Sequence, residues 1–158
     1  MLLRLGNVFV TGGASGIGFE IARQFGESGA MLSLIDYNEK TLVKATSVLQ
    51  QMGYPVNPFV LDVSDQEAVL DCVDKAEAIA PIDVLVNNAG ICLVTPFLEL
   101  TKEEWNRTLD INLTGAFYVA QAVCRYMAKR KNGSVLNMSS KNGLDGEFGH
   151  AHYNSSKA

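Results

Sequence analysis

The sequence has little of what marks membrane, nucleic-acid-binding or disulfide-bonded proteins. Its 158 residues include three cysteines and one tryptophan, and no apolar run approaches the roughly 20 residues that cross a bilayer. Thirteen Lys and Arg against 17 Asp and Glu give a net charge of −4, which excludes the strongly basic surface of a duplex binder. With 47% hydrophobic and 19% charged residues, the chain can bury a core, so we expect an ordered protein.

The cysteines and the N-terminus bear on cellular location. Cys72, Cys92 and Cys124 are odd in number, widely spaced and in apolar company, so we expect buried thiols in a reducing compartment. The first apolar residues lead into a glycine-rich turn without a signal-peptide cleavage site. The one basic cluster, residues 129–131, ends a predicted helix, where cations suit the helix dipole. We therefore expect a cytoplasmic protein with neither a membrane nor a nucleic-acid partner.

Short β-rich runs alternate with longer amphipathic runs along the chain. This alternation predicts parallel strands joined by right-handed crossovers, with helices on both faces of the sheet. The capping boxes Ser64–Glu67 and Thr101–Glu104 predict where two of the helices begin. The predicted fold class is therefore α/β, a doubly wound parallel sheet (a Rossmann fold) in a single domain over residues 1–158. The expected strands are 7–11, 31–35, 56–61, 83–87 and 133–139, and the expected helices are 17–28, 40–52, 65–80, one or two over 101–129, and one from 153 onward.

A glycine-rich turn lies between the first predicted strand and the first helix. Gly12 permits a tight turn, Gly16 lets the backbone approach a pyrophosphate, and Gly18 allows the helix to pack closely on the strand. Free N–H groups at the helix start would then face the phosphates. The context predicts a dinucleotide site, although such a turn could also be a simple connection.

Asp36 ends the second predicted strand, eighteen residues after Gly18. A carboxylate there can accept hydrogen bonds from both hydroxyls of the adenosine ribose and would repel a 2′-phosphate, so it favours NAD over NADP. No Arg or Lys occurs between Met31 and Glu39 to counter this charge. Asp36 could also cap the next helix, and the two roles are compatible.

The glycine pattern TGxxxGxG resembles that of the short-chain dehydrogenase/reductase family, and the resemblance recurs along nearly the whole chain. Asp62-Val63 follows the third strand, Asn87-Asn-Ala-Gly90 follows the fourth, and Asn112 stands in a predicted helix. Ser140 ends the fifth strand, thirteen residues before the YxxxK motif of Tyr153 and Lys157. The resemblance implies that the cofactor is bound by Gly12, Ser15, Gly16, Ile17, Gly18, Asp36, Asp62, Val63, Asn88, Ala89, Gly90, Tyr153 and Lys157.

The same resemblance implies an NAD-dependent oxidoreductase that interconverts a secondary alcohol and a ketone, with Tyr153 as the acid/base. A free phenol has a pKa of about 10, too high for a base at neutral pH, and Lys157 lies on the same helical face, where its ammonium can stabilise the phenolate. The resemblance further implies that Lys157 holds the nicotinamide ribose and that Ser140 stabilises the substrate oxygen. Asn112 is implied to position a water for proton relay. Ser139 is the alternative candidate for the role of Ser140. Adjacent strand residues face opposite sides of a sheet, so only one of the two serines can point at Tyr153, and the thirteen-residue spacing favours Ser140.

Substrate contacts should come from the loops after the fourth and fifth strands. The segment Ile91–Phe97 supplies an apolar wall. Asn142, Glu147 and His150 could bond hydroxyls of a sugar, polyol or hydroxy acid, although a solvated loop is an equally good interpretation. His150 and His152 lack a third nearby ligand such as Cys, so no metal site is predicted.

The sequence ends one residue after Lys157, where complete members of the resembled family continue with further strands and a substrate lid. We therefore expect a fragment whose C-terminal strands are missing, and expect the intact protein to form a homodimer or homotetramer. Spacing disfavours two relatives of this family, the extended-type epimerases and the enoyl reductases. A non-catalytic NAD-binding module, or an inactive fragment, stays open as the alternative function.

Overall fold

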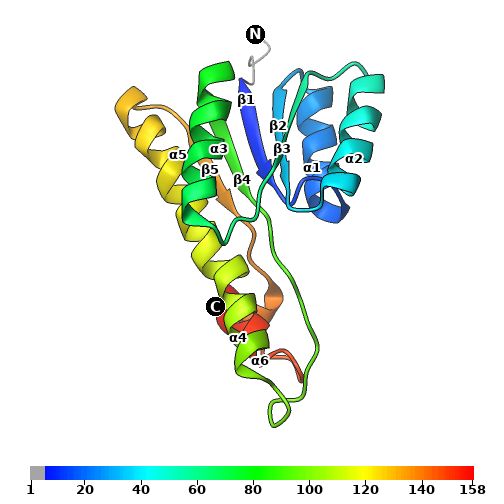
Figure 1. Cartoon of the computed structure of the whole chain (residues 1–158), viewed down its shortest axis with the longest axis vertical. Coiled ribbons are helices and arrows are strands. Elements are labelled where there is room, and N and C mark those ends of the chain that lie inside the picture. The colour runs from blue at the N-terminus through cyan, green and yellow to red at the C-terminus, as the bar shows by residue number, and fades with distance from the viewer. Residues whose placement is uncertain (1–5) are drawn as a thin grey trace.

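The computed structural model describes residues 6–158 and is built around a five-stranded parallel sheet in the order β3-β2-β1-β4-β5. The central strand β1 pairs with β2 and β4, which in turn pair with β3 and β5 (Figure 1). Because the strand order reverses beside β1, the carboxyl ends of β1 and β4 flank a crevice where ligands of open α/β sheets bind. The strands are β1 (Asn7–Thr11), β2 (Met31–Asp36), β3 (Val56–Val60), β4 (Ile82–Asn87) and β5 (Ser134–Asn137).

Helices cover both faces of the sheet, as the alternation of elements predicts. Side chains of successive strand residues point to opposite faces, so Val8 and Val10 pack under α1 and α2 while Phe9 packs under α3 and α5. All three side chains are fully buried, and each such burial contributes roughly 1.5–3 kcal/mol. The doubly wound α/β fold is therefore confirmed. The covering helices are α1 (Gly16–Glu27), α2 (Glu39–Gln51), α3 (Gln66–Ile79) and α5 (Ala116–Arg130).

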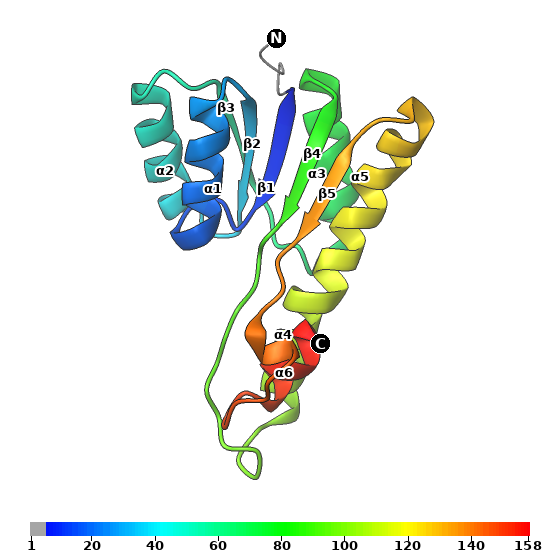
Figure 2. The same ribbon diagram turned by 180° about the vertical axis from the view of Figure 1, so that it is seen from behind.

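A second group of elements extends beyond the carboxyl ends of the strands (Figure 2). The helix α4 (Lys102–Leu109) continues through a π-helical segment, Asp110–Gly115, into α5. Helix α6 (Ala151–Lys157) packs beside α4, and a short 3-10 turn (Lys141–Gly143) packs against α6. The capping box at Thr101 is confirmed: Glu104 N donates to Thr101 Oγ1 (3.1 Å) and Thr101 N donates to a Glu104 carboxylate oxygen (3.3 Å).

Three predicted element boundaries are wrong. Helix α3 is capped by Asp65 and not by Ser64: the Asp65 carboxylate accepts from Ala68 N (3.0 Å), while the Ser64 hydroxyl donates to Asp62 (2.7 Å). The sequence offers two capping residues one position apart, and local folding of Ser64 onto Asp62 decides between them. Strand β5 ends at Asn137, because its partner β4 ends at Asn87, so Ser140 lies beyond the strand. Helix α6 begins at Ala151, two residues before Tyr153.

The expectation that all three cysteines are buried is also wrong. Of the three cysteines, only Cys72 is buried, and burial raises its pKa to about 12; Cys92 and Cys124 are exposed. Apolar neighbours in sequence do not bury a thiol on the outer face of a helix or in a loop. Lys129 and Arg130 lie in the last turn of α5, as predicted. Arg130 also makes a bidentate ion pair with the buried Glu77 carboxylate and donates to the carbonyl of Ile82 (2.8 Å).

Within residues 6–158, no helix has the length and apolarity needed to cross a bilayer. The same part of the chain contains no group of three His, Cys, Asp or Glu side chains placed to hold a metal ion.

Candidate active site

The glycine-rich turn joins β1 to α1, and its glycines have different structural roles. Gly12 and Gly16 have positive φ angles of 62° and 54°, a conformation that glycine adopts without strain. A Cβ on Gly18 would collide with the carbonyl oxygen of Gly12, so Gly18 is required by the packing of the turn itself. A Cβ on Gly16 would meet nothing within 4 Å, so this glycine borders open space beside the start of α1.

The end of β4 holds this turn in place. The side-chain amide of Asn88 donates to the carbonyls of Thr11 (3.0 Å) and Gly12 (3.2 Å). The Thr11 hydroxyl accepts from the backbone N–H groups of Asn88 and Ala89, both at 3.0 Å. Asn88 therefore lies where the sequence predicts a cofactor residue, and its side-chain N–H groups are already used to shape the turn.

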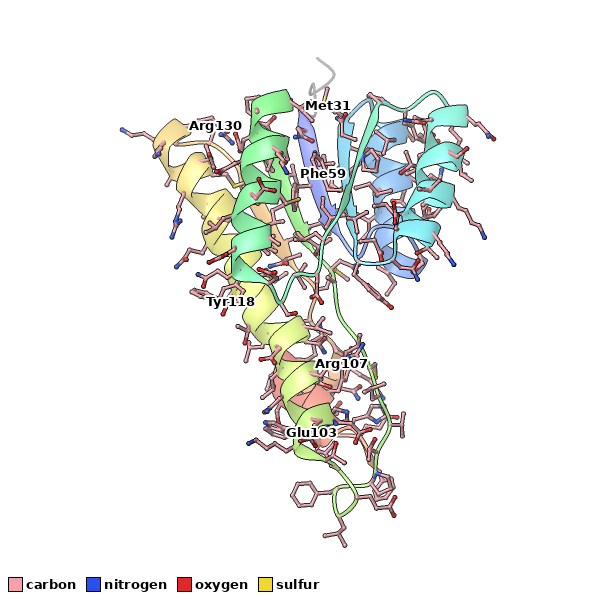
Figure 3. The ribbon with its side chains drawn as sticks, in the orientation of Figure 1. Met31, Phe59, Glu103, Arg107, Tyr118 and Arg130 are labelled. Atoms are coloured by element: carbon pink, nitrogen blue, oxygen red, sulfur yellow. The ribbon has the colours of Figure 1, made fainter. Side chains whose placement is uncertain are left out.

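A cavity of about 850 Å³ runs along the carboxyl ends of the strands. Most of the cofactor residues expected from the sequence line it; Gly16, Gly18, Tyr153 and Lys157 do not. The cavity also reaches residues that the sequence analysis missed, on α4 and just after β2. Figure 3 shows Arg107 and Glu103 on α4, which forms the far wall. The expected residues in the lining are Gly12, Ser15, Ile17, Asp36, Asp62, Val63, Asn88, Ala89 and Gly90, and the missed ones include Tyr37, Asn38, Glu103, Asn106, Arg107 and Asp110.

The missed wall residues on α4 had no signal in the sequence. The residues on α4 belong to the amphipathic pattern of a solvated helix, and only its approach to the segment after β4 brings them to the cavity. Tyr37 and Asn38 adjoin Asp36 and could have been found as its neighbours.

Asp36 lies at the end of β2 and is 9% exposed. One carboxylate oxygen accepts from Ala14 N (3.2 Å) and the other from Asn38 N (3.0 Å). Each oxygen keeps a further lone pair, because a carboxylate offers about four acceptor positions. The side chain is thus fixed at the cavity with acceptor capacity to spare, as a ribose diol requires.

Tyr153 and Lys157 lie one turn apart on α6, and the Lys157 ammonium is 6.0 Å from the centre of the Tyr153 ring. Lys157 Nζ donates to the carbonyl of Met138 (2.9 Å), just beyond β5. Partial burial lowers the pKa of Lys157, and no carboxylate pairs with it among residues 6–158. A partly desolvated cation beside a phenol is an arrangement that stabilises a phenolate.

Asn112 sits in the π-helical segment and links three parts of the site. Its amide oxygen accepts from Ile91 N (2.8 Å), and its amide nitrogen donates to Ile91 O (2.9 Å) and to Ser156 Oγ (3.0 Å). Both side-chain N–H groups are therefore used within the protein, so they cannot hold a water. A Cβ on Gly90 would lie 3.2 Å from Asn112 Oδ1 and 3.8 Å from Lys157 Nζ, which places Asn112 close to the ammonium.

The two serines after β5 have different contacts. Ser139 Oγ donates to the backbone carbonyl of Lys157 (3.4 Å), whereas Ser140 Oγ accepts from Asn142 N (3.2 Å) at the start of the 3-10 turn. Ser139 therefore supports the end of α6. The hydroxyl hydrogen of Ser140 has no acceptor among residues 6–158 and is available to a substrate oxygen.

The loops after β4 and β5 are joined by a hydrogen bond from Thr95 N to the carbonyl of Gly149 (2.8 Å). Asn142 is buried, and its amide nitrogen donates to the Glu147 carboxylate (3.0 Å) and to Asn154 Oδ1 (3.2 Å). The Asn142 amide N–H groups are thus committed inside the protein, while Glu147 is exposed. The rings of His150 and Tyr153 meet edge to face at 6.1 Å, so His150 borders the phenol.

Two further residues of α6 were missed from the sequence. Ser156 Oγ donates to the carbonyl of Tyr153 (2.8 Å) and accepts from Asn112, so it ties the turn that carries the phenol to the π-helical segment. His152, next to Tyr153, is fully buried and neither ring nitrogen has a partner among the described residues. A seven-residue helix is too short to show which of its faces is buried.

The chain resembles proteins of known activity over nearly its whole length. A family model described as short chain dehydrogenase matches residues 6–158. A 3-oxoacyl-[acyl-carrier-protein] reductase, FabG, of Thermotoga maritima is 37% identical over 150 residues, 94% of this chain and 61% of the relative. A 5-keto-D-gluconate 5-reductase of Escherichia coli is 39% identical over 135 residues, 85% of this chain and 53% of the relative.

A solved structure of NAD⁺-bound xylitol dehydrogenase superposes with a TM-score of 0.91 at 34% identity, covering 97% of this chain and 59% of that one. The chain thus spans between half and two thirds of the length of these similar proteins.

Proposed function

The chain belongs to the short-chain dehydrogenase family. We propose that the full-length protein is an NAD-dependent oxidoreductase that interconverts a secondary alcohol and a ketone. The observation that carries the proposal is the pairing of Tyr153 with the partly desolvated ammonium of Lys157 beside a dinucleotide-sized cavity. The names of the relatives cited above, a 3-oxoacyl-[acyl-carrier-protein] reductase, a 5-keto-D-gluconate 5-reductase and a xylitol dehydrogenase, support oxidation and reduction between an alcohol and a ketone.

The residues present suit a nicotinamide dinucleotide. The open space at Gly16 and the free start of α1 suit its pyrophosphate, since a side chain at this position would occupy that space. Asp36 would accept from the adenosine ribose, and Asp62 and Val63 would border the adenine. When bound, the dinucleotide supplies the acceptor or donor of the hydride.

The protein's own residues would then manage the proton. Tyr153 takes the proton from the alcohol or returns it to the ketone oxygen. The Lys157 ammonium stabilises the phenolate, and the Ser140 hydroxyl donates to the substrate oxygen as charge develops there. Asn112 and Ser156 would act by positioning, since their contacts hold α6 against Ile91 and the π-helical segment. A relay water beside Lys157 would need a ligand other than the Asn112 N–H groups.

The decisive experiment is an assay of the natural polypeptide with NAD and a panel of secondary alcohols, including sugars, polyols and hydroxy acids. We expect substrate-dependent formation of NADH, followed by its absorbance. Dinucleotide binding without turnover of any alcohol would instead favour the second candidate, a non-catalytic NAD-binding module.

The preference for NAD over NADP rests on Asp36. The buried carboxylate faces the cavity, and a 2′-phosphate placed there would meet a like charge. A cation does lie nearby: Lys44 lines an adjoining groove, and Ser15 and Thr41 border both the groove and the cavity. Lys44 is thus placed to serve a 2′-phosphate once the carboxylate is removed.

We expect Asp36→Ser to change the ratio of the Kd values for NAD and NADP by about 100-fold toward NADP, equivalent to about 2.7 kcal/mol. The serine hydroxyl can still accept from a backbone N–H while the negative charge is gone. Fluorescence titration with each dinucleotide measures the ratio. Adding Lys44→Gln to Asp36→Ser should reverse part of the gain in NADP affinity. An unchanged ratio in Asp36→Ser would remove Asp36 from cofactor selection.

We also propose a homo-oligomeric assembly and a cytoplasmic location for the full protein. Leu113 and Phe117 are each about half exposed along the helix that runs from α4 into α5, where a second subunit could cover them. The described cysteines are all free, which suits a reducing compartment. Equilibrium sedimentation that shows only monomers at working concentrations would contradict the assembly.

A further inference from the structure

We infer, on the basis of the alcohol dehydrogenase function proposed above, that Glu147 determines substrate specificity: its carboxylate selects neutral, hydroxyl-rich alcohols and disfavours substrates that carry a carboxylate or phosphate. The names of the relatives include both kinds, xylitol on one side and 5-keto-D-gluconate on the other. Membership of the family therefore leaves this choice open, and a charged side chain at the substrate loop can decide it.

Glu147 is held in a defined position although its side chain is exposed. Asn142 Nδ2 donates to one of its carboxylate oxygens (3.0 Å), and Asn154 Nδ2 donates to its backbone carbonyl (3.2 Å). Asn142 also donates from its backbone to Ser140, and Asn154 adjoins Tyr153 on α6. The carboxylate is thus tied, through one residue on each side, to the two groups proposed to act on the substrate oxygen.

The loop after β4 faces the same space from the opposite side. Burial raises the pKa of the Cys92 thiol, the Glu147 carboxylate raises it further, and the Lys157 ammonium opposes both. Val94, two residues after Cys92, packs against the loop that carries Glu147, since a Cβ on Gly149 would lie 2.9 Å from the Val94 side chain. Because the loops are joined at Thr95 and Gly149, a substrate between Cys92 and Tyr153 would lie beside the Glu147 carboxylate.

The negative charge of Glu147 is not cancelled by an ion pair within residues 6–158. The hydrogen bond from Asn142, with smaller contributions from Lys141 and His150, lowers its pKa, so the side chain is ionised at neutral pH. The Lys157 ammonium donates to the backbone carbonyl of Met138 and makes no ion pair with Glu147. An anionic substrate would thus meet a like charge at Glu147 that no direct ion pair cancels.

An ionised carboxylate is also a good receptor for polyols. It accepts hydrogen bonds and cannot donate them, and one Glu147 oxygen has no partner among the described residues. Substrate hydroxyls can donate to that oxygen, whereas a substrate carboxylate has no proton to offer at neutral pH. The same group therefore attracts one class of substrate and repels the other.

The test compares kcat/KM for xylitol and for xylonate, its carboxylate analogue, in the wild-type protein and in Glu147→Gln. The glutamine keeps the shape and an oxygen to accept from Asn142 but removes the charge. We expect the ratio of xylonate to xylitol kcat/KM to rise about tenfold, the order expected for one like-charge contact at the edge of a site. Asp145→Asn, which removes an equal charge two residues away in the same loop, should change the ratio less than twofold.

A salt titration of the wild-type protein gives an independent reading that needs no substitution. Screening should raise the xylonate to xylitol ratio as ionic strength increases, and this dependence should be largely absent in Glu147→Gln. A ratio that neither the substitution nor salt changes would overturn the role of Glu147 while leaving the proposed function standing. Absence of turnover with any alcohol in the wild-type protein would overturn the proposed function itself.

Discussion

Replacing Tyr153 with phenylalanine should lower kcat by about a thousandfold and leave the affinity for NAD within about twofold. The substitution removes the only group proposed to exchange a proton with the substrate oxygen, and a positioned acid/base contributes typically 10²–10⁴ in rate. The hydroxyl of Tyr153 makes no hydrogen bond within residues 6–158, so the fold should lose nothing. Steady-state turnover and a dinucleotide titration measure the two quantities.

The control for this prediction is Tyr126→Phe, which removes a hydroxyl of the same kind from α5. That hydroxyl donates to Asp74 on α3 (2.8 Å). Neither residue lines the cavity or belongs to the proposed site. We expect kcat to be unchanged. Turnover by Tyr153→Phe close to that of the wild-type protein would remove the phenol from the mechanism, and with it the observation on which the proposed function depends.

Gly18→Ala should destabilise the protein by about 3 kcal/mol or more, an effect large enough to prevent folding of a marginally stable chain. The added methyl group would overlap the carbonyl oxygen of Gly12, and its other neighbour is the Asn88 amide that holds the turn. Neither is the free end of a flexible side chain, so the turn or the helix must move. Urea-induced unfolding, followed by circular dichroism, measures the loss.

Gly16→Ala provides the matched comparison in the same turn. Its methyl group would enter open space, so the only cost to the fold is the positive φ angle, about 1 kcal/mol. Dinucleotide affinity should instead fall by about tenfold or more, because the methyl group would occupy the space proposed for the phosphates. If Gly16→Ala binds NAD normally, the phosphates do not lie at this turn; if Gly18→Ala is as stable as the wild-type protein, the packing of the turn is not as tight as described.

Much of the fold could be predicted from the sequence, because its determinants are local. The alternation of apolar strands with amphipathic helices follows from residue periodicity, and the single glycine-rich turn between β1 and α1 could be located from its composition. The end of β5 was wrong because it depends on a partner elsewhere, since β5 ends where β4 leaves it. The cap of α3 was wrong because two capping residues compete within a few residues, and Asp65 caps the helix once Asp62 takes the hydroxyl of Ser64.

The candidate site divides in the same way. The four-residue spacing of Tyr153 and Lys157 places them on one face of any α-helix. The position of Asp36 at the end of an apolar run predicts that it ends a strand, whichever strands that strand pairs with. The sequence did not reveal that both N–H groups of Asn142 are committed within the protein, nor that α4 forms a wall of the cavity. The first fact depends on how residues 142–154 fold back on one another, and the second on where α4 lies relative to the ends of the strands.

The amino-acid order alone thus determined the kinds of elements, their order along the chain, and that Tyr153 and Lys157 lie one helical turn apart. These features follow from backbone geometry over a few residues. Only the tertiary structure decided which cysteines are exposed, how far Lys157 is withdrawn from water, and which hydrogen-bond donors remain free for a ligand. Burial and hydrogen bonding depend on residues far apart in the chain, and they become defined only when those residues meet.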